Sequence, residues 1–177
     1  MPTTITKTIT LYTFEELSPE AQQKALEHLC DLNVDYDWWE YIYDDAASIG
    51  LRIDEFDIYR NTISGCLTED PENVIAAILE EHGEDCKTCK TAKDYQGQYN
   101  TTLAAHVAVD PENNDERSLR DTQWYDEFHS ELCHALKEDY LVMLRHEYEY
   151  QTSDEQIKES ITANEYKFDE DGALCYG

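Results

Sequence analysis

The chain has 177 residues, of which 41% are hydrophobic, so it can bury a core, and a wholly disordered chain is excluded. Forty Asp and Glu stand against 13 Lys and Arg, and the net charge of −27 far exceeds the roughly 2 to 8 charges that suit a small soluble domain. No stretch approaches the roughly 18 apolar residues of a membrane span, and the N-terminal MPTTITKTIT lacks the apolar run of a secretory signal, so we expect a cytoplasmic protein with reduced cysteines and no membrane partner.

The N-terminal region predicts a strand followed by a helix. Residues 5–13 alternate apolar and polar side chains with a period of two, which is typical of a strand. Ser18 is a favourable N-cap and Pro19 suits the first helical position, so we expect a helix to begin here. Its buried stripe comprises Ala21, Ala25, Leu26 and Leu29.

The segment NVDYDWWEYIYDD, residues 33–45, combines aromatic rings with carboxylates and has no basic residue. We predict a helix that Asp35 caps and that ends near Ile49, before Gly50. In one interpretation both faces of this helix are packed and its acids form a narrow solvated strip. In the other, an acidic and aromatic surface is exposed to a partner. The buried stripe comprises Val34, Trp38, Tyr41, Ile42, Ala46 and Ile49, the second stripe Tyr36, Trp39 and Tyr43, and the acids between them Asp37, Glu40 and Asp44.

The middle of the chain predicts two strands and a helix. Residues 51–58 alternate imperfectly, and the phase slip near Glu55 indicates a β-bulge. A turn at residues 60–61 leads to a second strand. Thr68 or Asp70 then caps a helix over residues 71–83. Residues 84–114 show the weakest pattern, and we expect loops there with room for a short helix.

The C-terminal third predicts two helices and a hairpin. Apolar side chains recur every four residues in a long helix over residues 115–150. Ser153 and Gln156 form a capping-box pattern for the next helix, and Asp171–Gly172 is a tight-turn signal near the C-terminus. The whole chain is therefore expected to be one α+β domain, with a small antiparallel sheet packed against several helices. The long helix carries the repeat Trp124, Phe128, Leu132, Leu136, Tyr140 and Leu144.

The acidic residues are spread over the predicted elements instead of forming a tail, which indicates a folded negative surface. Proteins that bind DNA do so with fields of Lys and Arg, so a folded array of carboxylates can occupy such a field and compete with nucleic acid. The alternatives are a solvated acidic surface, a high-salt habitat or a generally acidic proteome. Direct binding of nucleic acid is disfavoured, because the single basic cluster, Lys87, Lys90 and Lys93, is small.

The cysteines give only a weak indication of a metal site. Cys86 and Cys89 form a CxxC pair, but structural zinc needs four ligands, and Cys66 with His82, or Cys133 with His134, would complete a site only if the fold brought them close. A redox motif of the thioredoxin kind would need a βαβ setting that the sequence does not predict. Calcium-loop spacing and the common catalytic motifs are also missing. We therefore expect no enzyme, no cofactor and no bound metal.

Three segments of the chain carry a resemblance to a known family. NVDYDWWEYIYDDAASIGL, AAILEEHGEDCKTCKTAKD and EDYLVMLRHEYEYQTSDEQIKESITANEYKFDEDG resemble acidic proteins of bacteriophages and prophages, which are sometimes labelled antitoxins of a toxin–antitoxin stability system. The resemblance covers most of the chain and is least clear over residues 96–120. It implies expression in a bacterial host and action against host defence, and it transfers no catalytic residue.

These observations lead to a non-enzymatic protein that inhibits a host nuclease, restriction enzyme or CRISPR complex by mimicking nucleic acid. The expected partner is a basic, nucleic-acid-binding host protein. The alternative is an antitoxin-like, regulatory or scaffold protein without mimicry, which self-associates, for example as a homodimer, through an exposed apolar stripe on residues 124–144. A third hypothesis is a metal-dependent protein that uses the cysteines. The expected partner contacts are Asp35, Asp37, Trp39, Glu40, Tyr43 and Asp44, with Glu147 and Glu149 as a second patch.

Overall fold

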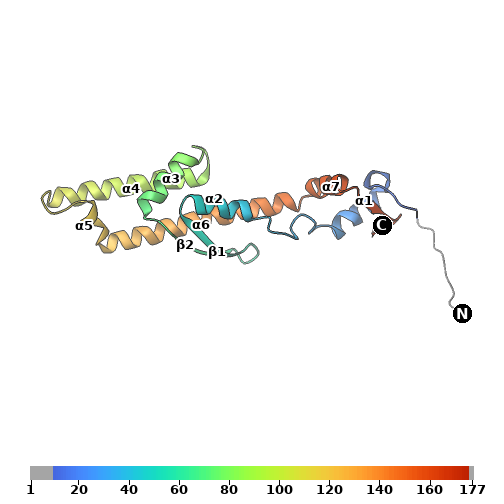
Figure 1. Cartoon of the computed structure of the whole chain (residues 1–177), viewed down its shortest axis with the longest axis horizontal. Helices are drawn as coiled ribbons and strands as arrows, with labels where there is room; N and C mark the ends of the chain where they lie inside the picture. The colour runs from blue at the N-terminus through green and yellow to red at the C-terminus, as the bar shows by residue number, and fades with distance from the viewer. Residues whose placement is uncertain (1–9, 176–177) are drawn as a thin grey trace. The chain divides into compact units, whose positions relative to one another are not determined.

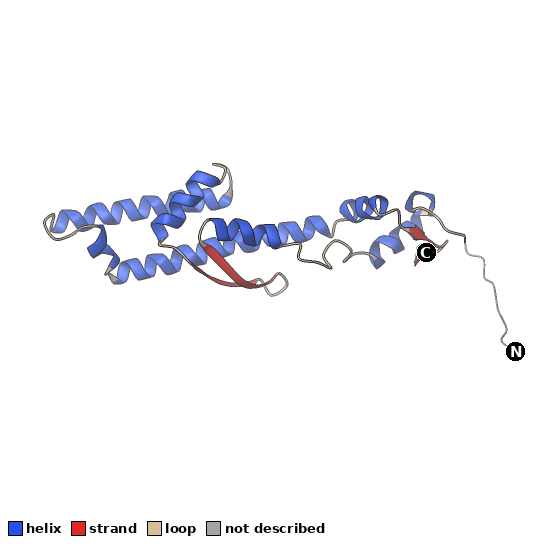
Figure 2. Cartoon of the chain, in the orientation of Figure 1, coloured by secondary structure: helices blue, strands red, loops and turns tan. Residues whose placement is uncertain are grey.

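The computed structural model describes residues 10–175 and has an α+β architecture in which helices predominate (Figure 2). The expected fold class is confirmed, with short antiparallel strand pairs accompanying a set of helices. Where we expected one domain, the contacts group the chain into two compact units. Unit 1 comprises residues 1–38 and 146–177 as far as they are described, and unit 2 comprises residues 39–145. Within the described part, no helix combines the length and apolar composition needed to cross a bilayer.

Unit 1 is built around two short helices and a hairpin. It contains the 3-10 helix η1 (Phe14–Glu16), α1 (Pro19–His28), the last turns of α6 (Gln123–Gln151), α7 (Asp154–Ala163), β3 (Lys167–Phe168) and β4 (Leu174–Cys175). Its core includes Phe14, Ala21, Ala25, Ile157, Ile161 and Phe168, all less than 5% exposed.

The predicted N-caps and turn of unit 1 are confirmed, but the N–H of Ser153 donates to the carbonyl of Tyr150, so the capping box expected with Gln156 does not form. The Oγ of Ser18 accepts the N–H of Ala21, and the Oγ of Ser153 accepts the N–H of Gln156. Gly172 has a φ of +87° in the C-terminal hairpin, as its place in a tight turn requires. Of the strand expected over residues 5–13, residues 5–9 lie outside the described part of the chain. Tyr12 forms a single antiparallel bridge to Phe168.

The helix expected from Asp35 begins later, at Glu40, so α2 spans Glu40–Ser48. The preceding residues instead form turns held by unit 1. The amide of Asn33 donates to the carbonyl of Gln151 and accepts from the hydroxyl of Ser160, and the ring of Trp38 lies 5.7 Å from that of Tyr148. These tertiary contacts outweigh the helical pattern of the sequence. The burial expected for Trp38 is confirmed, whereas Tyr41, expected in the same stripe, is 54% exposed.

Unit 2 combines α2 and a β-hairpin with four further helices, one of which is the greater part of α6 (Figure 1). The hairpin is formed by β1 (Leu51–Asp57) and β2 (Thr62–Leu67), which pair antiparallel with the predicted bulge between Ile53 and Glu55. The predicted helix after the hairpin is α3 (Pro71–Glu81). The apolar repeat of α6 forms the core, because Phe128, Leu132, Leu136, Tyr140 and Leu144 are each at most 2% exposed.

The expectation of loops over residues 84–114 is wrong, because most of this segment is the 23-residue helix α4 (Lys87–Val109). Apolar side chains are sparse along α4, so the hydrophobic periodicity of the sequence does not indicate a helix. α4 packs through aromatic rings instead. Tyr95 and Tyr99 lie 5.5 and 5.8 Å from Phe128 of α6, ring centre to ring centre. Figure 1 shows α4 running beside α6.

The helix expected over residues 115–150 is interrupted once. A short helix, α5 (Glu116–Arg120), is followed by a turn, and α6 begins at Gln123. Each helix has its own start signal. The carboxylate of Asp115 accepts the N–H of Ser118, and the hydroxyl of Thr122 accepts the N–H of Tyr125. The second signal, Thr122, comes just before the apolar repeat that begins at Trp124, within the segment that the sequence predicts as one helix.

Candidate functional site: an acidic and aromatic groove

A groove of about 740 Å³ lies on unit 2 where α2 meets the hairpin. Its aromatic part is a cluster of three rings. Trp39, the N-cap of α2, and Tyr43, one turn later, both make edge-on contacts with Phe56 of β1, at 5.5 and 6.1 Å between ring centres. The groove is lined by Trp39, Tyr43, Asp54, Glu55, Phe56, Asp57, Arg60, Thr62, Ile63 and Ser64.

The β-bulge places two consecutive acids in this groove. In a regular strand, neighbouring side chains point to opposite faces, and a bulge changes this alternation. Here the register passes from Ile53 opposite Gly65 to Glu55 opposite Ser64, which leaves Asp54 as the extra residue. Gly65 permits this geometry, because a Cβ atom at that position would lie 2.2 Å from the carbonyl oxygen of Arg52.

The charge of the groove is predominantly negative. Asp54, Glu55 and Asp57 line it together with one base, Arg60. The Nε of Arg60 lies 3.7 Å from Asp57, and its side chain is 85% exposed, so this ion pair is a weak, solvent-screened one. Burial, followed by the charges of Asp54 and Glu55, raises the pKa of the Tyr43 phenol above its ordinary value.

The structure divides the eight expected contact residues between the two units. Trp39 and Tyr43 line the groove, while Glu40 and Asp44 are exposed on α2 but do not line it. The other four belong to unit 1, where Asp35, Asp37 and Glu149 are exposed and Glu147 accepts a 2.7 Å hydrogen bond from Gln151. Because Asp37 precedes α2, the acidic stripe expected at helical spacing from Asp37 to Asp44 does not form.

The sequence pattern does not predict the hairpin side of the groove. It indicates a bulged strand over residues 51–58, which contains Asp54, Glu55, Phe56 and Asp57, but it does not connect the bulge with a binding surface. The signal was present in the phase slip near Glu55, because a slip places adjacent residues on one face. Nothing in the spacing indicates that Phe56 meets rings from α2, since that contact depends on tertiary packing.

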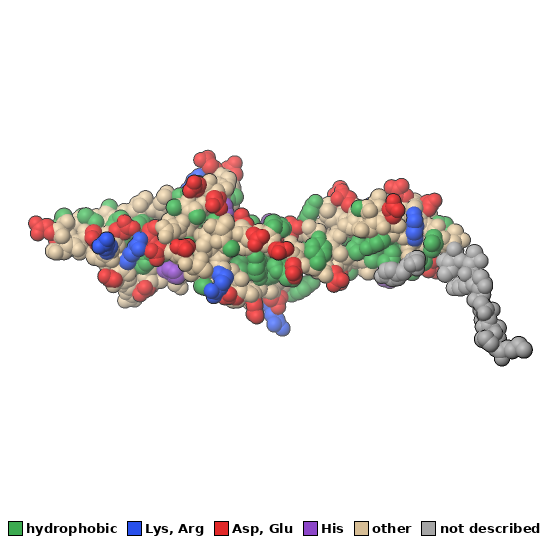
Figure 3. Space-filling view, viewed as in Figure 1, with side chains coloured by type: hydrophobic (Ala, Val, Ile, Leu, Met, Phe, Trp, Pro, Cys, Tyr) green, Lys and Arg blue, Asp and Glu red, His purple; other side chains and the backbone are tan. Residues whose placement is uncertain are grey.

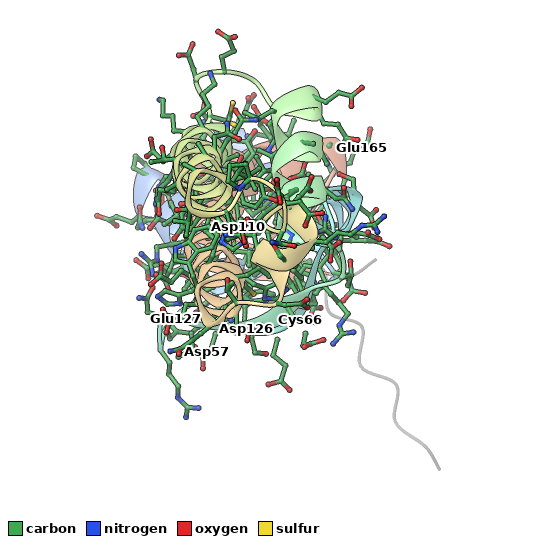
Figure 4. The ribbon with its side chains drawn as sticks, turned by 90° about the vertical axis from the view of Figure 1, so that its left-hand side faces the viewer. Asp57, Cys66, Asp110, Asp126, Glu127 and Glu165 are labelled. Carbon is green, nitrogen blue, oxygen red and sulfur yellow. The ribbon has the colours of Figure 1, made fainter. Side chains whose placement is uncertain are left out.

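Both units are acidic beyond the groove. Unit 2 contains 24 Asp and Glu against 9 Lys and Arg, a net charge of −15, and unit 1 contains 16 against 4, a net charge of −12. Figure 3 shows carboxylates spread over the visible face of each unit. On unit 2, Asp126 and Glu127 are exposed at the start of α6 (Figure 4). The basic cluster is small, and Lys87 is already paired with the buried Asp139 at 2.9 Å.

Some acids of unit 2 serve the fold and are not exposed as a binding surface. Glu72 accepts hydrogen bonds from the hydroxyls of Tyr99 and Tyr125, at 2.8 and 2.7 Å, and pairs with Arg120 at 3.1 Å. Burial raises the pKa of Glu72, but the hydrogen bonds from Tyr125 and Tyr99 and the charge of Arg120 outweigh it and lower that pKa below its ordinary value. This carboxylate connects α3 with α4, α5 and α6.

The cysteine pair lies at the first turn of α4. Cys86 is the N-cap, and its Sγ accepts the N–H of Cys89 at 3.3 Å. Among residues 10–175, no three His, Cys, Asp or Glu side chains come together in a way that could hold a metal ion. Within the described chain, neither Cys66 with His82 nor Cys133 with His134 joins the CxxC pair in such a group.

Comparison of the chain with protein-family models, curated proteins and solved structures finds no match. A function must therefore be argued from the groove and from the distribution of charge.

Proposed function

We propose that the chain is a non-enzymatic binding protein that occupies the nucleic-acid site of a basic protein and so competes with DNA or RNA. The observation that carries this proposal is the groove of unit 2, in which three rings adjoin three carboxylates. A nucleic acid offers a basic protein negative charge and flat aromatic bases, and this groove offers carboxylates and rings within about 740 Å³.

The occupant that best fits the groove is an arginine-rich segment of the partner. A guanidinium group donates two hydrogen bonds to one carboxylate and also stacks on aromatic faces, whereas a lysine ammonium is a compact, strongly hydrated charge. Trp39, Tyr43 and Phe56 supply the rings. Glu55 and Asp54 supply adjacent carboxylates, of which that of Asp54 also pairs with Arg52 at 2.9 Å. The net charge of −27 adds long-range steering toward a basic surface, which raises the association rate at low salt.

The resemblance to acidic phage proteins supports a bacterial setting for this activity. Under the proposal, the protein acts in the host cytoplasm on a nuclease, a restriction enzyme or a CRISPR complex. The alternative of self-association through α6 finds less support, because five residues of its apolar repeat are buried within one copy of the chain. An exposed stripe was the feature expected of that alternative.

Capture from a bacterial lysate tests the function. The immobilised protein should retain basic nucleic-acid-binding proteins at low salt, and both added duplex DNA and high salt should release them. Bound proteins that neither DNA nor salt releases would contradict mimicry. The identity of the retained proteins, read by mass spectrometry, then names the target.

Two variants of equal charge test the groove. Asp54→Asn, Glu55→Gln and Asp57→Asn together remove three charges from the groove, and Asp126→Asn, Glu127→Gln and Glu131→Gln together remove three exposed charges from α6. Binding of a labelled oligoarginine peptide, followed by anisotropy, should weaken about tenfold or more in the groove variant and about twofold or less in the α6 variant. Equal losses would show that net charge alone binds the peptide.

A comparison of oligoarginine with oligolysine, which has the same charge, tests the role of the rings. Wild-type protein should bind oligoarginine more tightly than oligolysine of the same length, because only the guanidinium stacks well. Phe56→Leu should reduce this preference while leaving the salt dependence of binding unchanged. If the preference is absent, the rings take no part in recognition.

A further inference from the structure

We propose that Cys86 and Cys89 form a redox-active dithiol, in which Cys86 attacks disulfides and Cys89 resolves the mixed disulfide. This activity is separate from the binding function of the groove. It was disfavoured from the sequence because no βαβ unit was predicted, but the structure supplies the local geometry on a different framework.

The first observation is the placement of the two thiols on α4. Cys86 is the N-cap of this 23-residue helix, and its Sγ accepts the N–H of Cys89 at 3.3 Å. The N-terminus of a helix carries partial positive charge, which favours a thiolate at that position. Cys86 is partly exposed, whereas Cys89 is 1% exposed. An external disulfide can therefore reach Cys86 and not Cys89.

The second observation is a buried imidazole directed at the same place. The side chain of His82 is only 9% exposed, and its Nε2 has no hydrogen-bond partner. Its Nδ1 lies 2.7 Å from the hydroxyl of Thr88, and that hydroxyl lies 3.2 Å from the Sγ of Cys86. The hydroxyl of Thr88 therefore bridges the imidazole and the thiol.

This bridge provides a route for the thiol proton. When Cys86 ionises, its proton passes to the hydroxyl of Thr88 while that hydroxyl gives its own proton to the Nδ1 of His82. The imidazolium then has a proton on Nε2, which lies 3.6 Å from the Oδ1 of Asp45 and gains an electrostatic partner there. The arrangement resembles the nucleophile, base and orienting acid of covalent catalysis, with one hydroxyl inserted.

The surroundings leave room for a small substrate. Asp45, His82, Cys86, Lys87 and Thr88 line a cavity of about 390 Å³. The charged side chains that line this cavity with Cys86 are the carboxylates of Asp45 and Glu81 and the ammonium of Lys87, which pairs with Asp139 at 2.9 Å. A metal does not account for the cluster, because the described residues bring no three ligands together.

The exchange reaction balances with a disulfide as the oxidant. The thiolate of Cys86 attacks one sulfur of the disulfide, forms a mixed disulfide and releases the other sulfur as a thiolate. Cys89 then loses its proton and attacks the sulfur of Cys86, which releases the second thiol. The external disulfide is reduced to two thiols, and the protein is oxidised to a Cys86–Cys89 disulfide.

The oxidant in the test is glutathione disulfide. The first measurement locates the disulfide that forms in protein whose Cys86 and Cys89 are both unchanged. Residues 61–87 form one tryptic peptide that also contains Cys66, so a Cys66→Ser background removes the ambiguity. After oxidation, this peptide should be found linked to residues 88–90. Failure to find that link, or links only between molecules, would overturn the proposal.

The rate of mixed-disulfide formation is the second readout. With Cys89→Ser added to that background, glutathione should accumulate on Cys86 about tenfold or more faster than on the exposed Cys30 of the same chain. Thr88→Val should reduce this advantage and Thr88→Ser should preserve it, because only serine keeps the bridging hydroxyl. Equal rates at Cys86 and Cys30 would show that the site does not activate the thiol.

Discussion

The hydroxyl of Tyr140 donates a 2.7 Å hydrogen bond to the Oδ2 of Asp45, which joins the buried face of α6 to α2. Tyr140 is fully buried, and burial, followed by the hydrogen bond to Asp45, raises the pKa of its phenol. The adjacent Asp44 is exposed. Two identical neighbours in the sequence therefore have different roles, one in the fold and one on the surface.

Alanine substitutions at these two neighbours should separate the roles. Asp45→Ala leaves the buried hydroxyl of Tyr140 without its acceptor and should lower the free energy of unfolding by about 1–3 kcal/mol. Asp44→Ala removes the same charge from an exposed position and should change it by no more than about 0.5 kcal/mol. Urea unfolding followed by circular dichroism measures both. Equal effects would mean that the hydrogen bond to Tyr140 contributes nothing.

Glu72 should make the protein sensitive to acid. Because its folded pKa lies below the ordinary value of 4.5, it stabilises the fold fully above that pH, and this contribution is lost as the pH falls through the lowered value. Glu72→Gln should therefore destabilise the protein at pH 7, and the difference from wild type should shrink as the pH falls below 4.5. The exposed Glu84→Gln is the control and should show no such trend. Urea titrations at several pH values, in dilute protein, measure the trend.

Gly65→Ala and Gly97→Ala should have opposite effects. A Cβ at residue 65 would lie 2.2 Å from the carbonyl oxygen of Arg52, so the bulge must shift, and we expect a loss of about 1–3 kcal/mol in the free energy of unfolding. A Cβ at residue 97, inside α4, meets nothing within 4 Å, so alanine there should stabilise by about 0.5–1 kcal/mol. Stabilisation by Gly65→Ala would contradict the role of the bulge. Gly65→Ala should also weaken binding of the oligoarginine peptide.

Asn33 and Ser160 should be energetically coupled in unit 1. The hydroxyl of Ser160 donates to the amide oxygen of Asn33 at 2.6 Å, while the amide nitrogen donates to the carbonyl of Gln151. Asn33→Ala should cost about 1–3 kcal/mol, since it leaves the partly buried hydroxyl of Ser160 and carbonyl of Gln151 unpaired. A double-mutant cycle with Ser160→Ala should give a coupling energy of at least about 0.5 kcal/mol. Simple additivity of the two substitutions would show that the pair does not interact in solution.

Local signals in the sequence predict the parts of the fold that depend on neighbouring residues. Ser18 and Ser153 mark helix starts, the phase slip near Glu55 marks the bulge, and the repeat through Leu136 marks a buried helix. The predictions are wrong where contacts between residues far apart in the sequence determine the local structure. Turns before Glu40 replace the predicted helix because Asn33 bonds to Gln151 and Ser160, far along the chain.

The residues of the candidate site also divide into those that the local sequence indicates and those that depend on tertiary packing. Trp39 and Tyr43 could be chosen from the sequence because rings among acids are unusual for a solvated helix. Their partner Phe56 could not, because it approaches from β1 through tertiary packing. The environment of Cys86 was also hidden, since His82 and Thr88 meet it only when α4 is formed as a helix.

The hairpin has a consequence for how the protein behaves in mild acid. Only β1 and β2 pair in this sheet of the described chain, so each strand has one side whose backbone groups could pair with a strand of another molecule. The bulge distorts one such side, and the charges of Asp54, Glu55 and Asp57 repel a second copy. As the pH approaches the isoelectric point of about 4.2, this repulsion vanishes. The same carboxylates that we assign to partner binding are thus also the barrier that keeps copies of the protein from joining strand to strand into aggregates.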